Sequence, residues 1–91
     1  MKRVRVVVSG RVQGVGYRYS LWIVADRAGL SGWVRNRYDG SVEAELEGSS
    51  QGVADVLTWM LGGPSGAWVR DRQVTPLEPT GETGFRVRGD V

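Results

Sequence analysis

The stretch Gly10-Arg-Val-Gln-Gly-Val-Gly-Tyr-Arg18 joins a valine-rich segment to a segment with helical periodicity. Its three glycines let a short loop curl tightly and expose its backbone N–H groups. Arg18 follows at the start of the expected helix, where the dipole and the unpaired N–H groups already favour an anion. A loop of backbone N–H donors that is followed by a guanidinium suits a phosphate better than a neutral ligand. The stretch therefore predicts a strand, a loop and a helix with an anion site between them.

The loop differs from the two common nucleotide-binding loops. It lacks the Gly-Lys-Ser/Thr ending of a triphosphate-binding loop, and Gly10, Gly14 and Gly16 do not have the dinucleotide-binding spacing. Glycine-rich turns are common in proteins. The loop alone therefore leaves open a second interpretation, in which Gly14 and Gly16 only turn the chain and Arg18 is a solvated helix residue.

Hydrophobic periodicity predicts the elements on either side of the loop. Alternating valines indicate a strand over residues 3–9, with Val4, Val6 and Val8 on one face. Residues 17–28 have the three- and four-residue spacing of a helix, and Gly29 is expected to end it in the left-handed conformation, with Leu30 packing after it. The buried side of this helix should consist of Leu21, Val24, Ala25 and Ala28.

The next two strands, residues 32–37 and 41–47, are joined around Asp39-Gly40. A two-residue turn would place Arg35 and Arg37 in the core, because a one-residue slip reverses every side chain. A three-residue loop over residues 38–40, with Gly40 left-handed in a bulge, instead puts Asn36 on the apolar face. It also sets Arg35 opposite Glu43. Burying arginines costs more, so we expect the three-residue loop.

The second half of the chain repeats the helix and strand patterns. Ser49 or Ser50 should cap a helix that Gly62-Gly63-Pro64 ends, followed by a strand over residues 67–74, a loop over 75–84 and a short strand over 85–88. The core side of the helix should consist of Val53, Val56, Leu57, Met60 and Leu61. This order predicts an α+β, ferredoxin-like βαββαβ fold, an antiparallel-rich sheet with two helices on one face and a short extra C-terminal strand. Arg18 and Asn36 would then lie close together.

Composition limits the possible functions. The 91 residues are enough for one domain, residues 1–91. The chain has no cysteine or histidine, which excludes disulfides, thiolate metal sites and a Ser-His-Asp triad. No long apolar segment is present, so we expect no signal peptide or membrane span and a cytoplasmic location. The net charge of only +2 does not suggest a partner that is a nucleic acid or a membrane.

Three segments together resemble the acylphosphatase family: Gly10-Arg-Val-Gln-Gly-Val-Gly-Tyr-Arg18, Ala28-Gly-Leu-Ser-Gly-Trp-Val-Arg-Asn36 and Asp39-Gly-Ser-Val-Glu43. Gly63-Pro64 and the closing Phe85-Arg-Val-Arg88 extend the likeness over nearly the whole chain. The resemblance implies the ferredoxin-like fold and hydrolysis of carboxyl-phosphate mixed anhydrides without a cofactor or a metal. It also implies a small acyl phosphate as substrate and inorganic phosphate as product and inhibitor, and we expect a monomer.

The resemblance assigns roles to individual residues. Arg18 matches the family's phosphate-binding arginine, and Asn36 matches the asparagine that orients the attacking water. The backbone N–H groups of Val15, Gly16, Tyr17 and Arg18 match the phosphate cradle. Tyr17 stands where phenylalanine is common, which should be tolerated if its hydroxyl finds a partner.

Two other functions are weighed against hydrolysis. Ferredoxin-like domains also bind RNA on their open sheet face, but Glu43, Glu45 and Glu47 should repel a phosphate backbone there. The chain could also be an acylphosphatase-like accessory domain without turnover, because similar domains occur within larger hydrogenase-maturation proteins. Only an assay separates this alternative from the enzyme.

Overall fold

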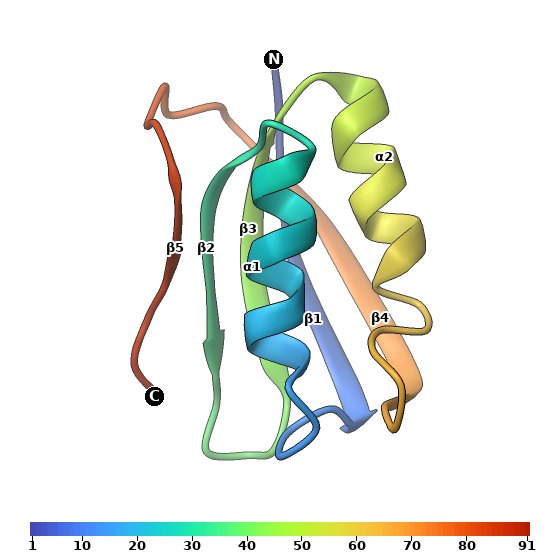
Figure 1. Cartoon of the computed structure of the whole chain (residues 1–91). Helices are drawn as coiled ribbons and strands as arrows, with labels where there is room; N and C mark the ends of the chain where they lie inside the picture. The colour runs from blue at the N-terminus through green and yellow to red at the C-terminus, as the bar shows by residue number, and fades with distance from the viewer.

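Two helices cover one face of a five-stranded sheet in the computed structural model, which describes all 91 residues (Figure 1). The elements are β1 (Lys2–Arg11), α1 (Tyr17–Arg27), β2 (Ser31–Asn36), β3 (Val42–Gly48), α2 (Ser50–Trp59), β4 (Trp68–Leu77) and β5 (Phe85–Val87). The strands lie in the order β4-β1-β3-β2-β5, and only the pairing of β5 with β2 is parallel. The predicted ferredoxin-like order with an extra C-terminal strand is confirmed.

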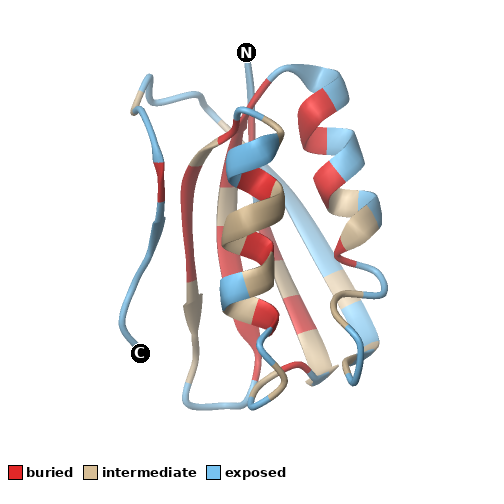
Figure 2. Ribbon diagram, in the orientation of Figure 1, coloured by how far each residue is buried: buried red, intermediate tan, exposed pale blue.

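The core lies between the sheet and the two helices, where Figure 2 shows the buried residues. Alternation along β1 buries Val4, Val6 and Val8 as predicted, because side chains on a strand point to opposite faces in turn. Leu21 and Ala25 of α1 belong to the same core cluster as these valines, together with the buried face of α2. That face includes Val53 and Val56, and the C-cap residue Met60 is buried directly after it.

The β2–β3 hairpin has the predicted three-residue loop. Asn36 pairs with Val42 and Arg35 pairs with Glu43, so Asn36 lies on the face that the helices cover. The N–H of Arg37 donates to the carbonyl of Ser41 at 2.9 Å and closes the loop over residues 38–40. Gly40 has the expected left-handed φ of 92°.

Three expectations need correction. Leu61 is 53% exposed, not in the core, because α2 ends at Trp59 and Leu61 lies in the turn that follows. Val24, Ala28 and Leu57 are only half-buried. The strand expected to end at residue 74 continues to Leu77, through Pro76. Proline cannot donate to a neighbouring strand, but β4 is an edge strand with β1 on one side only, so the missing donor costs little there.

Arg3 forms a buried ion network on the sheet face away from the helices. Its side chain is 3% exposed and pairs with Glu45 at 2.8 Å, Glu47 at 2.9 Å and Glu82 at 2.6 Å. Buried charges are tolerated when they are paired in this way. Glu47 also accepts the backbone N–H groups of Thr80 and Gly81. The network therefore ties the segment before β5 to β1 and β3.

We predict that Glu47→Gln destabilises the protein at neutral pH but not in strong acid. The Thr80 N–H, the Arg3 guanidinium and the Gly81 N–H together lower the pKa of Glu47 from 4.5 to about 2. A carboxyl whose pKa is lowered on folding adds stability above its unfolded pKa and loses it as pH falls through the folded value. The difference between wild type and Glu47→Gln in urea-unfolding free energy should thus shrink between pH 4.5 and pH 2.

Glu78→Gln is the matched control, because Glu78 is exposed and makes no ion pair in the structure. This variant should unfold like wild type at both pH values. A wild type–Glu47→Gln difference that stays constant with pH would contradict the role of the ionised carboxylate.

Candidate active site

The loop between β1 and α1 presents backbone N–H groups at the start of a helix. Gly14 and Gly16 have φ values of 75° and 78°, the left-handed region that glycine adopts readily. Gly16 is the N-cap of α1, and its carbonyl accepts the first helical hydrogen bond from Ser20 at 2.9 Å. A β-carbon on either glycine would meet nothing within 4 Å, so backbone conformation and not space requires glycine here.

These N–H groups have no acceptor in the protein. The N-cap of α1 makes no side-chain hydrogen bond, in contrast to Ser49 of α2, whose hydroxyl accepts the N–H of Gly52 at 3.0 Å. The N–H groups of residues 15–19 make no backbone hydrogen bond either. Uncapped donors at a helix N-terminus carry a partial positive charge and favour an anion.

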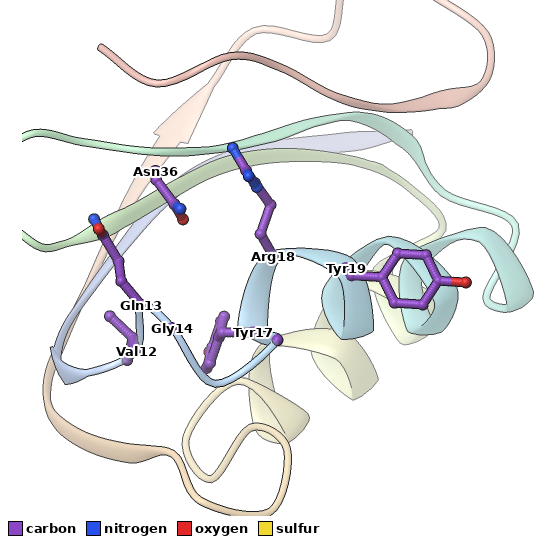
Figure 3. A pocket seen from close by; sticks show the side chains of 8 residues that line it. Val12, Gln13, Gly14, Tyr17, Arg18, Tyr19 and Asn36 are labelled. Atoms are coloured by element: carbon purple, nitrogen blue, oxygen red, sulfur yellow. The ribbon is translucent and has the colours of Figure 1, made fainter.

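A pocket of about 350 Å³ opens at this loop and brings together Arg18 from α1 and Asn36 from the end of β2 (Figure 3). The structure therefore brings these two predicted site residues together. Gly16 and Tyr17 of the predicted cradle also line the pocket, whereas Val15 does not. The eight lining residues are Val12, Gln13, Gly14, Gly16, Tyr17, Arg18, Tyr19 and Asn36.

Asn36 carries an unsatisfied acceptor. Its side-chain oxygen Oδ1 is buried and has no hydrogen-bond partner within the protein. In Figure 3 the side chain of Asn36 points from the strand toward the loop. Buried polar atoms nearly always have a partner, so such an atom marks a place where a bound molecule can donate a hydrogen bond.

Arg18 is bonded to the segment that follows β5. Its Nη1 donates to the Asp90 carboxylate oxygen Oδ1 at 2.8 Å and to the Arg88 carbonyl at 3.2 Å. Its Nε and Nη2 groups make no bond within the protein, and the side chain is 32% exposed. The pairing with Asp90 was not expected from the sequence, because 72 positions separate the two residues and no motif links them.

Tyr17, the first residue of α1, is buried and bonded to the segment that follows α2. Its side chain is 1% exposed, and its hydroxyl donates to the carbonyl of Met60 at 2.7 Å. Burial raises the pKa of this phenol, which therefore stays neutral and keeps its proton for that bond. The hydroxyl has the partner that tolerance of tyrosine at this position requires.

Gln13 makes contacts that the sequence analysis did not anticipate. Its side-chain nitrogen Nε2 donates to the carbonyl of Arg37 at 2.7 Å and to the carbonyl of Ser41 at 2.9 Å. These partners flank the β2–β3 turn, 24 and 28 positions away along the chain. The side chain thus connects the loop before α1 to the turn that follows Asn36.

No group of three or more His, Cys, Asp or Glu side chains is arranged so that it could hold a metal ion. Neither helix is long and apolar enough to cross a membrane.

The chain as a whole matches proteins of one family. The acylphosphatase family model matches residues 4–87. An acylphosphatase of Trichormus variabilis is 50% identical over 86 residues, which cover 94% of this chain and 85% of the relative. The crystal structure of an acylphosphatase from Bacillus subtilis superposes with a TM-score of 0.93 at 37% identity, covering 97% of this chain and 99% of the other.

A longer protein contains a similar unit. The structure of full-length HypF in its phosphate- and nucleotide-bound form matches 98% of this chain with a TM-score of 0.91 at 26% identity, but the match covers only 12% of HypF. The family model nevertheless covers most of this chain, and the relatives of similar length match it over most of their own length. The chain belongs to the acylphosphatase family.

Proposed function

We propose that the protein hydrolyses the carboxyl-phosphate bond of small acyl phosphates to a carboxylate and inorganic phosphate. One observation carries the proposal: uncapped N–H groups, a partly free guanidinium and an unsatisfied amide oxygen meet in one pocket. Relatives of similar length bear the name acylphosphatase, which supports the same reaction. A cytoplasmic monomer that needs no metal or cofactor remains part of the proposal.

The loop and Arg18 would hold the phosphoryl group. The backbone N–H groups of Val15, Gly16, Tyr17 and Arg18 would donate hydrogen bonds to one oxygen of the phosphoryl group. The free Nε and Nη2 of Arg18 would donate to two of its oxygens as a fork. Charge on the equatorial phosphoryl oxygens is what such donors stabilise in the transition state.

Asn36 would orient the attacking water. Its Oδ1 lacks a partner and can accept a hydrogen bond from water, which leaves a lone pair of that water for phosphorus. The water oxygen forms a bond to phosphorus as the bond to the acyl oxygen breaks, and the electron pair leaves with the carboxylate. The proton of the water goes to a phosphoryl oxygen of the substrate, so no protein base is required.

This mechanism fits a chain without histidine or cysteine. A carboxylate is a good leaving group because its pKa is low, so no strong general acid is needed. The remaining tasks are positioning and electrostatic stabilisation, which arginine, amide and backbone groups perform.

The second candidate function is an accessory domain that binds an anion but does not hydrolyse it. The match to a small part of HypF favours this alternative, because there a unit of this fold lies within a longer protein. Hydrolysis of benzoyl phosphate in EDTA, followed by loss of its absorbance, separates the two functions. Turnover well above the spontaneous rate supports the enzyme. Turnover at the spontaneous rate by folded protein supports the accessory domain.

The Asn36→Ala variant should lose at least about 10²-fold in kcat, by analogy with removal of a preorganised hydrogen-bonding group. Inhibition by inorganic phosphate should change little, because the phosphate donors remain in place. Steady-state kinetics with benzoyl phosphate measures both quantities. A kcat within a few-fold of wild type would remove Asn36 from the mechanism. Metal independence has a separate test in wild type: activity that is lost in EDTA and restored by added metal would contradict it.

The Arg18→Ala variant should lose nearly all activity and bind inorganic phosphate more weakly, since the principal cationic donor is gone. Arg27→Ala is the matched control, because Arg27 lies on the same helix, is exposed and makes no ion pair. The control should retain wild-type kinetics. If phosphate inhibited Arg18→Ala as strongly as wild type, another group would have to hold the anion.

A further inference from the structure

The amide of Gln13 lies between the two halves of the candidate site. Gln13 belongs to the loop that presents the N–H donors, and it lines the same pocket as Arg18 and Asn36. Its side chain is half-buried and crosses to the turn that immediately follows Asn36. Figure 3 shows the Gln13 side chain rising from the loop beside Asn36.

The turn that Gln13 contacts is already closed by its own backbone. The N–H of Arg37 donates to the Ser41 carbonyl at 2.9 Å, and the N–H of Gly40 donates to the Arg37 carbonyl at 3.0 Å. Each of the two carbonyls then accepts a second hydrogen bond from Gln13 Nε2. The Gln13 bonds are therefore not needed to form the turn. What they add is a fixed distance between the turn and the loop.

We propose that Gln13 is a positioning residue that sets where Asn36 lies relative to the phosphoryl group. The inference rests on the proposed hydrolysis and adds a residue to it. Asn36 directly precedes Arg37, so holding the Arg37 carbonyl holds the strand end that carries the Asn36 amide. The loop that Gln13 belongs to holds the phosphate. The two Gln13 bonds thus control the alignment of water with phosphorus.

A small displacement of one reacting group from the other slows the reaction strongly. Misplacement by about 1 Å can lower a rate on the order of 10²-fold, because the attacking atom no longer lies in line. Neither the loop N–H donors nor Arg18 bonds to the Gln13 side chain. Loss of the Gln13 bonds should therefore affect the rate of the chemical step more than the binding of phosphate.

The test compares wild type with Gln13→Met, which keeps the length of the side chain but cannot donate. We expect kcat for benzoyl phosphate to fall by about tenfold or more, with the inhibition constant of inorganic phosphate within about twofold of wild type. Gln13→Glu should lose more than Gln13→Met at pH 7, because its carboxylate would face two carbonyl oxygens. Gln51→Met is the matched control, since Gln51 is exposed on α2 and bonds only to Asp55.

Each result has a distinct meaning. If wild type fails to exceed the spontaneous rate, the proposed hydrolysis itself is wrong. If wild type turns over and Gln13→Met has the kinetics of Gln51→Met, the positioning role of Gln13 is wrong and the hydrolysis stands. Thermal unfolding provides the last comparison: equal losses of kcat and phosphate affinity, together with a large drop in Tm, would make Gln13 a structural residue and overturn the inference.

Discussion

The pairing of Asn36 with Val42 is the constraint on which the site depends. Adjacent residues on a strand point to opposite faces, so this pairing alone decides whether Asn36 faces the helices or the open side of the sheet. The same register sets Arg35 against Glu43, with the guanidinium and the carboxylate 2.8 Å apart. It also leaves Val34 in the core, opposite Ala44. Apolar burial, charge pairing and the position of the candidate amide are thus three consequences of one loop length.

A second constraint comes from the glycines at close backbone contacts. A β-carbon on Gly32 would lie 1.9 Å from the Glu45 carbonyl oxygen, and one on Gly10 would lie 2.3 Å from the Trp68 carbonyl oxygen. Both glycines also have positive φ values. Unlike Gly14 and Gly16, where space is free, these two positions exclude any side chain. Gly10 lies where the register of β1 against β4 shifts, one residue before the strand ends, and so directs the chain into the loop between β1 and α1.

Local patterns predicted what depends on local physics. Alternating valines, helical spacing, the Gly29 cap and the cost of burying Arg35 together gave the fold and the face on which Asn36 lies. The extension of β4 through Pro76 was missed, because proline usually marks a loop and only the position of the strand at the sheet edge makes it harmless. Leu61 was placed in the core because periodicity does not show where a helix ends.

Contacts between distant segments were not predictable, and they shape the site most. The sequence gives no sign that Arg3 is buried among three carboxylates, because one of them, Glu82, comes from the loop between β4 and β5. Gln13 and Asp90 are polar residues whose sequence neighbours give no sign of their partners. Pairing of this kind depends on which segments the finished fold brings together.

These long-range bonds share a physical effect on the two candidate catalytic side chains. In the segment after β5, the Asp90 carboxylate accepts a hydrogen bond from Arg18 Nη1, and the Val91 N–H donates to the Asn36 carbonyl at 3.1 Å. Gln13 holds the same strand end from the side of the loop. A long arginine side chain loses considerable rotamer entropy when it is fixed, and a bond that exists before substrate arrives moves part of that cost into folding. Catalysis by positioning requires groups that are already in place. In the proposed reaction, Arg18 would be held in place by the C-terminal segment, and Asn36 by both that segment and the loop near the N-terminus.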